Sequence, residues 1–419
     1  MLTLSILIIF VLGYLAIIFE HKIGVNKTTS ALLTAGILWA LVFQSPEISQ
    51  FHHYRFLQEE LSGVIQIVLF LIGALAIVEV INAHKGFSHV AALLNIRSKR
   101  KLLWVVGFIT FFLSAILDNL TTTIVMVSLI KKVIPEKEDR WTIGSAIVIA
   151  ANAGGAWTPI GDVTTTMLWI GGQLTSWNII SSLFLPSLAC LVLALIPLQF
   201  FLKGEATHQL TKQKTEPHGL LVLILGVSAL VFVPIFKSIT GLPPFMGILF
   251  GLAIIWMVTD FLHQGHPERG HLRVSGIMKR VDLPSVVFFL GILLAVGALH
   301  EVGILEELAN FLDQTLKSPV LIATVIGILS AIVDNVPLVA ASMGMYNLGE
   351  FPTDSSFWEL IAYTAGTGGS MLIIGSAAGV VFMGIEKTDF FFYLKRVTLS
   401  AAIGYFGGIG VYLLQQSFF

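Results

Sequence analysis

Two copies of one six-residue motif carry the acids with the clearest chemical potential in this sequence. Ser-Ala-Ile-Leu-Asp-Asn occupies residues 114–119, and Ser-Ala-Ile-Val-Asp-Asn occupies residues 330–335. Each motif brings a hydroxyl, a carboxylate and an amide into an apolar stretch, and hard oxygen ligands of this kind suit small alkali cations. A carboxylate can also hold a proton, so the motifs predict competition between H⁺ and a cation. We expect Na⁺ to bind at Asp118, Asn119, Asp334 and Asn335.

More oxygen-bearing residues cluster around both motifs and extend the predicted site. They are Ser114, Thr121, Thr122, Asn152, Asp162, Thr164 and Thr165 in the first half, and Ser330, Thr367, Gly368 and Ser370 in the second. The pairs Gly154-Gly155 and Gly368-Gly369 interrupt the apolar stretches that follow each motif. Discontinuous helices of this kind expose half-helix ends to an ion. Only the first half has an acid after its glycine pair, so the two half-sites are chemically unequal.

Four carboxylates remain at membrane depth once the acids of loops and span ends are set aside. They are Glu79, Asp118, Asp162 and Asp334, and no Lys or Arg of a predicted span is left to pair with them. A charge at this depth costs several kcal/mol, so such acids are functional candidates. The alternative for Asp118 and Asp334 is a hydrogen-bonded core residue. Glu79 could instead reach the cytoplasmic interface, and the glycine pairs could serve close helix packing.

Composition indicates that the bilayer is the solvent of this chain. Of its 419 residues 56% are hydrophobic and only 12% are charged, and the mean hydropathy is +0.88. The net charge of -1 lacks the concentrated basic face that nucleic acid requires. A single cysteine, Cys190, excludes an internal disulfide and disfavours a metal–thiolate site. No P-loop is present, so we expect transport driven by an ion gradient. For such a transporter we expect no enzymatic activity and no cofactor.

Hydropathy predicts an all-α polytopic membrane protein. Eight stretches read as ordinary spans of about 20 residues: Leu2–Phe19, Thr28–Phe43, Leu61–Ala83, Ser181–Leu202, Gly219–Phe236, Phe245–Leu262, Leu283–Leu299 and Val397–Leu414. Four further apolar stretches are interrupted by polar residues or glycine: 102–130, 141–172, 320–346 and 357–384. We expect the first apolar run to be a retained span, because it lacks a basic n-region and a cleavage site.

The motifs recur in the same order, which predicts an internal duplication. The first repeat covers 1–202, with a re-entrant hairpin at 102–131 and a broken helix at 141–172. A cytoplasmic linker, 203–217, precedes the second repeat, 218–419, with its hairpin at 318–346 and its broken helix at 357–386. Five spans in each half would invert the second half relative to the first. The prediction is therefore about ten spans and two hairpins.

Charge supports one orientation of this arrangement. With the loop 84–101 in the cytoplasm, all but three of the 24 Lys and Arg residues lie inside, the exceptions being Arg55, Lys237 and Lys317. Treating the hairpins as full spans would move the basic loop 131–140 outside. We therefore expect both termini in the periplasm.

Four segments resemble the NhaD-type sodium/proton antiporters of the ion transporter superfamily. They are SAILDNLTTT from Ser114, ANAGGAWTPIGDVTTT from Ala151, SAIVDNVPLVAASMGMY from Ser330 and GTGGSMLIIGSAAG from Gly366. The resemblance covers nearly the whole chain after about Leu61. It implies two helical hairpins, a homodimer with scaffold and transport parts, elevator-like movement, a bacterial inner membrane, and exchange of cytoplasmic Na⁺ or Li⁺ for external H⁺.

A sodium-coupled symporter of di- or tricarboxylates is the main alternative, because relatives with duplicated hairpins carry such anions. A passive channel or a membrane scaffold is a further alternative. An anionic substrate would be expected to meet a basic residue or a neutral pocket, whereas the predicted site is acidic. This favours cation exchange. A channel needs no inverted hairpins, and a scaffold needs no buried carboxylates.

Overall fold

The computed structural model describes residues 2–45, 49–91, 94, 96–205 and 216–418, so most of the predicted linker 203–217 lies outside it. The described residues form helices and no strand; the one bridge between extended residues joins Ser98 and Glu205. Seven described helices are long and apolar enough to cross a membrane, or eight if one bent pair counts as a span. The expectation of an all-helical polytopic membrane protein is therefore confirmed.

Helices follow one another along almost the whole described chain. The first half contains α1 (Leu2–Ile18), α2 (Glu20–Ile23), α3 (Lys27–Val42), α4 (Gln50–Ala83), α5 (Ser88–Ala91), α6 (Lys99–Leu117), α7 (Asn119–Val133), α8 (Lys137–Gly155), α9 (Val163–Ile170) and α10 (Ser176–Leu198). The second half contains α11 (Gly219–Thr240), α12 (Pro244–Leu262), α13 (Val274–Ile277), α14 (Leu283–Glu301), α15 (Ile304–Leu316), α16 (Pro319–Leu329), α17 (Asn335–Met345), α18 (Ser356–Gly368), α19 (Ala377–Glu386), α20 (Phe390–Arg396) and α21 (Thr398–Phe418).

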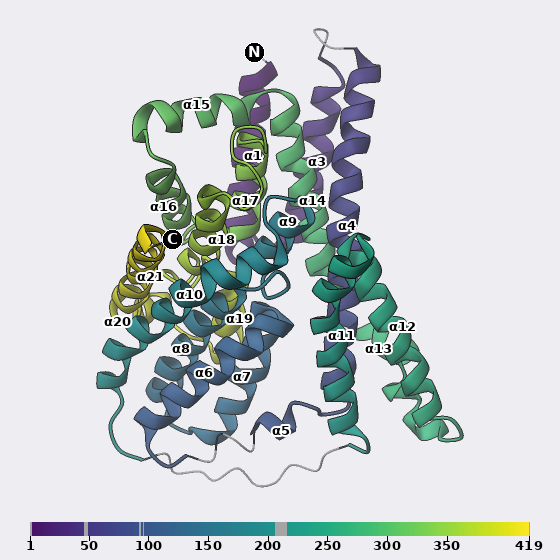
Figure 1. The fold of residues 1–419 in the computed structure, drawn as a ribbon, viewed down its shortest axis with the longest axis vertical. Coiled ribbons are helices and arrows are strands. Elements are labelled where there is room, and N and C mark those ends of the chain that lie inside the picture. Colours follow the sequence, from purple (N-terminus) through teal and green to yellow (C-terminus); the bar gives the residue numbers. More distant parts are fainter. Residues whose placement is uncertain (1, 46–48, 92–93, 95, 206–215, 419) are drawn as a thin grey trace.

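The helices gather into two groups (Figure 1). Helices α1, α3, α4, α11, α12 and α14 pack mainly on one another and are called the flanking bundle here. Helices α6–α10 and α16–α21 form the second group, called the site bundle because it contains both motifs. Glycines allow close contact within each group: a Cβ on Gly291 of α14 would lie 3.0 Å from the α3 backbone at Ala31, and one on Gly404 of α21 would lie 2.4 Å from the Cys190 carbonyl of α10.

Each motif lies where a helix stops and another begins. Asp118 separates α6 from α7, and residues 330–334 separate α16 from α17. The glycine-rich stretches are also interrupted, at 156–162 between α8 and α9 and at 369–376 between α18 and α19. Four helix breaks are thus present within the site bundle.

The same glycine contact occurs in both halves of the site bundle. A Cβ on Gly154 would lie 2.2 Å from the Phe111 carbonyl of α6, and one on Gly368 would lie 1.9 Å from the Gly327 carbonyl of α16. Any side chain there would push the first arm of the hairpin off the broken helix. Gly154 and Gly368 therefore serve close helix packing, the alternative considered from the sequence.

Two helices differ from the sequence prediction. Helix α4 begins at Gln50, well before the predicted start at Leu61, because Ser49 accepts a hydrogen bond from His52 N and caps a polar extension. Helix α15 was not predicted, because its charged face lowers its average hydropathy. It meets α16 at a bend of 117° and connects the two bundles along one edge of the molecule (Figure 1).

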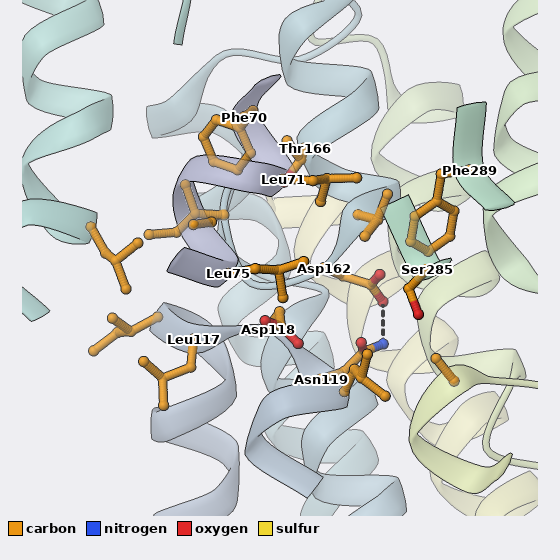
Figure 2. A pocket seen from close by; sticks show the side chains of 17 residues that line it. Phe70, Leu71, Leu75, Leu117, Asp118, Asn119, Asp162, Thr166, Ser285 and Phe289 are labelled. Atoms are coloured by element: carbon orange, nitrogen blue, oxygen red, sulfur yellow. Dashed lines mark hydrogen bonds between the residues drawn. The ribbon is translucent and has the colours of Figure 1, made fainter. Parts of the chain in front are cut away.

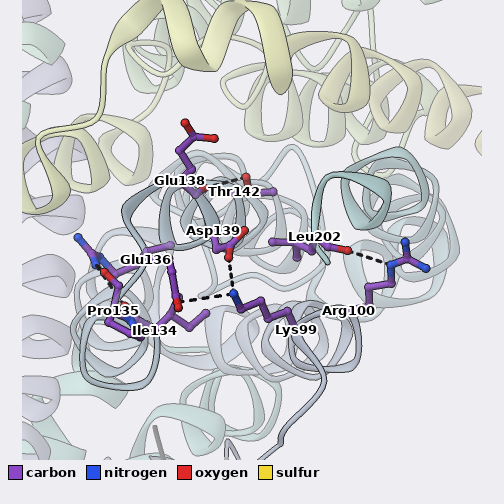
Figure 3. A network of polar contacts seen from close by, with 10 residues as sticks. Lys99, Arg100, Ile134, Pro135, Glu136, Glu138, Asp139, Thr142 and Leu202 are labelled. Carbon is purple, nitrogen blue, oxygen red and sulfur yellow. Dashed lines mark hydrogen bonds and ion pairs between the residues drawn. The ribbon is translucent and has the colours of Figure 1, made fainter. Parts of the chain in front are cut away.

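Ion pairs hold the helix ends farthest from α15. Lys99 Nζ at the start of α6 lies 2.6 Å from Asp139 Oδ2 and 3.6 Å from Glu136 Oε2, near the start of α8 (Figure 3). Arg100 Nε donates to the Leu202 carbonyl across 3.0 Å. These contacts join the start of α6 to the start of α8 and to Leu202, which follows α10.

Candidate functional site

Asp162 lies at the centre of the predicted site. It precedes α9 at the helix break, and only 2% of its surface is exposed. Its Oδ1 accepts a hydrogen bond from Thr164 N across 3.3 Å, so one carboxylate oxygen caps the helix. The other oxygen, Oδ2, faces the helix breaks at Asp118 and at 330–334, which are called the first and the second tip here.

Both motif asparagines donate to that oxygen. Asn119 Nδ2 lies 3.0 Å from Asp162 Oδ2, and Asn335 Nδ2 lies 3.2 Å from the same atom. Asn119 and Asn335 belong to different halves of the chain, and both are buried. The two tips therefore meet at a single carboxylate oxygen.

Asn152 extends this cluster into the second half. Its Oδ1 accepts from Asn119 Nδ2 across 3.1 Å, and its own amide donates to Ser370 Oγ and Ser376 Oγ, each across 2.9 Å. Ser370 and Ser376 lie at the ends of the break between α18 and α19. One connected network of neutral groups and one acid thus joins both helix breaks.

Asp118 and Asp334 cap their own helices. Asp118 Oδ1 accepts from Thr121 N across 2.7 Å, and Asp334 Oδ1 accepts from Val336 N across 3.1 Å. Thr121 Oγ1 also donates to Asp118 Oδ2 across 2.8 Å. Both acids are only partly buried. They flank Asp162 without a hydrogen bond to it among the described contacts.

The threonines differ in what their hydroxyls contact. Thr165 Oγ1 donates to the Asp162 carbonyl across 3.0 Å, which stabilises the start of α9. Thr164 Oγ1 and Thr122 Oγ1 are buried and have no hydrogen-bond partner among the described residues. Unsatisfied buried oxygens are costly, so these two are candidate ligands.

In other predicted residues the side-chain hydroxyl donates a hydrogen bond to a backbone carbonyl. Ser114 Oγ donates to the Ala151 carbonyl across 2.6 Å, and Ser330 Oγ donates to the Ala365 carbonyl across 2.7 Å. These matching contacts join the end of α6 to α8 and the end of α16 to α18. Thr367 Oγ1 donates to Tyr363 O within α18.

A cavity of about 50 Å³ lies between this network and the flanking bundle. Asp118, Asn119 and Asp162 line it from the site bundle, and Leu75 of α4 and Phe289 of α14 line it from the other side (Figure 2). Its described lining residues include no Lys or Arg. A space of this size can hold a water molecule or a small cation.

Comparison with known proteins identifies relatives over almost the whole chain. A family model described as citrate transporter matches residues 14–358. Sodium/proton antiporter 2 of Arabidopsis thaliana is 51% identical over 98% of this chain and 99% of its own length, and sodium/proton antiporter 1 of the same plant is 53% identical over 97% and 71%. The Na⁺/H⁺ antiporter NhaD of Alkalimonas amylolytica is 30% identical over 97% and 89%.

The chain belongs to the NhaD-type family. It is therefore a multi-pass membrane transporter, in agreement with the family resemblance seen in the motifs. The citrate-transporter description and the antiporter names point to different cargoes. For this NhaD-type chain the cargo has to be argued from its own site.

One sequence-based interpretation changes once the NhaD-type site is placed in the fold. Glu79 lies on α4, does not line the cavity, and accepts from Asn82 Nδ2 across 3.3 Å. This position favours the interfacial alternative for Glu79. Lys27, the first residue of α3, makes no ion pair with Asp334 among the described contacts. The expectation that no Lys or Arg of a predicted span pairs with the deep acids therefore stays a prediction.

The prediction from sequence missed two contributors from the flanking bundle. Ser285 of α14 lines the cavity, and Tyr14 of α1 contacts the second tip. Tyr14 is a polar side chain in an apolar span, which was the signal available in the sequence. It was missed because the first span was taken as an ordinary helix.

Proposed function

We propose that this chain exchanges cytoplasmic Na⁺ or Li⁺ for external H⁺. One observation carries the proposal: a single buried carboxylate oxygen, Asp162 Oδ2, receives the amides of both motif asparagines. Asn119 and Asn335 are neutral, so they leave the negative charge of Asp162 to be balanced by a proton or a metal cation. Their own Oδ1 atoms, with the hydroxyl of Thr164, would supply further hard ligands.

The competing function is symport of Na⁺ with a di- or tricarboxylate, which the description of the matching family model favours. A bound carboxylate anion would be expected to meet a basic residue or a neutral pocket. The described cavity lining instead carries Asp118 and Asp162 without Lys or Arg, and about 50 Å³ is too small for a molecule such as citrate. The nearly full-length relatives named as sodium/proton antiporters also favour cation exchange.

The proposed mechanism is competition for the same carboxylates. Asp162 with either a proton or Na⁺ is neutral enough to move through a low-dielectric region, whereas the empty anion is not. Asp118 and Asp334 flank it and would contribute to cation binding or carry the proton. Because one site holds only one of the two ions at a time, inward movement of H⁺ drives outward movement of Na⁺.

The two bundles support movement of the elevator type. The site bundle contains all four helix breaks, whereas the flanking bundle consists mostly of long continuous helices. An apolar layer separates them, including Val64 and Leu71 of α4, Met167 of α9 and Val336 of α17. We propose that the site bundle moves along this layer, and that two inverted halves and a homodimer complete the architecture.

Orientation follows from the basic loops. We propose a bacterial inner membrane with both termini in the periplasm. A reporter fused after Phe419 should then read periplasmic, and one inserted at 97–101 should read cytoplasmic. The opposite pair of results would overturn the inverted arrangement.

Everted membrane vesicles test the exchange directly. An acidified interior quenches a pH-sensitive dye, and adding NaCl or LiCl should restore its fluorescence, whereas KCl and sodium-free citrate should not. Adding sodium citrate should give the same response as the equivalent NaCl. A response that requires citrate would favour the symporter instead.

A further inference from the structure

The tip of the second hairpin touches the flanking bundle through a hydrogen bond. Asp334 N, at the start of α17, donates to the hydroxyl oxygen of Tyr14 on α1 across 2.9 Å. Asp334 and Tyr14 are 320 residues apart in the chain. A second polar contact joins the bundles elsewhere, from Lys237 Nζ of α11 to the Trp169 carbonyl of α9 across 3.0 Å, and a buried apolar cluster lies between the bundles.

The Tyr14 ring is held firmly on the flanking side. It packs against a buried cluster formed by Ile17, Ala31, Phe288 and Ile292, which come from α1, α3 and α14. Its neighbour Gly13 permits close packing of α1 on α3, because a Cβ there would lie 2.0 Å from Thr34 Oγ1. The hydroxyl is therefore fixed to the flanking bundle, and its partner is fixed to the site bundle.

A basic residue of the flanking bundle lies in the same cluster as Tyr14. Lys27 Nζ lies 4.4 Å from the centre of the Phe288 ring, which belongs to that cluster. The hydrogen bond between the Tyr14 hydroxyl and the backbone of Asp334 would be lost if the site bundle moved by more than a few ångströms.

The first tip has a different environment. The flanking residue of α11 that lines the cavity with Asp118 is Leu230, which is buried and cannot accept a hydrogen bond. Leu230 follows Tyr14 by the same number of residues as Ser330 follows Ser114, so the proposed duplication would pair these two positions. The two tips are therefore held unequally by the flanking bundle.

We propose that Tyr14 is a positioning residue that holds the second hairpin tip and favours the conformation observed here over the one that faces the other side of the membrane. The proposal rests on the proposed exchange by alternating access. Tyr14 does not bind the ion itself. Its hydroxyl stabilises one of two states, so its removal shifts their populations.

The test compares the KM for Na⁺ at the two faces of the membrane, in everted and in right-side-out vesicles. In Tyr14→Phe the KM should fall at one face and rise at the other, by up to about fivefold, the size expected for loss of one hydrogen bond. Tyr14→Leu places the residue found at Leu230 in this position, and it should shift both KM values in the same directions as Tyr14→Phe. This second variant provides the measurement if Tyr14→Phe accumulates poorly in the membrane.

Tyr405→Phe is the matched control. Its hydroxyl donates to the Thr324 carbonyl across 2.7 Å, a similar hydrogen bond made entirely within the site bundle. This variant should lower thermal stability and leave the ratio of the two KM values unchanged. If Tyr14→Phe also leaves the ratio unchanged, the positioning role is wrong. Wild-type vesicles without sodium-driven proton movement would instead overturn the proposed exchange.

Discussion

Asn335 donates its side-chain amide to Asp162 Oδ2 across 3.2 Å, and this hydrogen bond joins the hairpin tip of one half to the helix break of the other. The same oxygen accepts from Asn119. Because both tips donate a hydrogen bond to Asp162, a change in the charge of this acid would alter the hydrogen bonding of both tips. Its removal should therefore abolish exchange, whichever of the flanking acids carries the proton.

Asp162→Asn should abolish exchange, with a loss of about a hundredfold or more in sodium-driven proton release. Asn keeps the size of the side chain and can still accept from Thr164 N, but it can neither bind a proton nor balance a cation. Asp389→Asn is the matched control, because Asp389 caps α20 through Phe392 N at an exposed position. Dye dequenching in vesicles at equal protein level gives the comparison. Normal activity of the Asp162 variant would contradict the central role of this acid.

Asp118→Asn and Asp334→Asn should each impair exchange while leaving the fold intact. Both acids cap helices through an oxygen that Asn also possesses, and Asn is as good a cap as Asp. Any loss is therefore due to the missing charge. If one acid is the proton carrier, its variant should be inactive at every pH, and the other should show weaker Na⁺ affinity. Wild-type exchange in both variants would exclude a role for these charges.

Asp118→Gly should stabilise the protein and still impair exchange. Asp118 has φ 101° and ψ 156°, a conformation almost confined to glycine that costs about 1–3 kcal/mol for other residues. Glycine would relieve this strain and lose only a few tenths of a kcal/mol as a cap. Glycine also gives the unfolded chain extra conformational entropy, which offsets part of the relieved strain. The free energy of unfolding measured in detergent should therefore rise by about 1 kcal/mol. A clear fall in the free energy of unfolding would mean that the Asp118 carboxylate stabilises the fold by more than its capping hydrogen bond with Thr121 N.

Thr164→Val and Thr165→Val should have different effects. Thr164 Oγ1 is buried without a described partner, so Val should raise the KM for Na⁺ and leave thermal stability unchanged or higher. Thr165 Oγ1 donates to the Asp162 carbonyl, so Val should cost about 1 kcal/mol of stability. Sodium titration and thermal unfolding of the two single variants separate these effects. Equal KM values for Thr164→Val and wild type would make the Thr164 hydroxyl structural.

His263→Gln should flatten the pH dependence of stability below neutral pH. His263 follows α12, and its Nε2 lies 2.9 Å from His84 Nε2, beyond the end of α4. Burial, then His84, Arg269, His218 and Arg273, lowers the pKa of His263 from 6.5 to about 4. The unfolded chain binds the proton more readily, so this stability is present above about pH 6.5 and is lost as pH falls through about 4.

The melting temperature measured from pH 4 to 7 checks this expectation. The change of melting temperature with pH should become smaller in His263→Gln. It should not vanish, because burial also lowers the pKa of His84. His52→Gln is the control, since 62% of that side chain is exposed. An unchanged slope in His263→Gln would show that the histidine pair does not govern acid sensitivity.

Local sequence drew attention to the polar residues of the candidate site, because few other reasons bring such residues into apolar stretches. The structure places Asp162, Asn119, Asn152 and Ser370 in one network. Glu79 could not be assigned in this way, since its depth depends on where a long helix begins. Tyr14 could not be assigned either, because it acts across an interface between bundles that leaves no periodic pattern.

The sequence by itself determined the membrane setting, the paired motifs and the glycine-rich breaks, because hydropathy and backbone flexibility act over short stretches of chain. Only the tertiary structure decided which acid lies at the centre. Asn119 is 43 residues from Asp162 and Asn335 is 173 residues away, so their meeting depends on how the two hairpins pack. Cap geometry directs Asp118 and Asp334 toward their own helices, and a side-chain direction of this kind follows from backbone angles that composition and spacing do not specify.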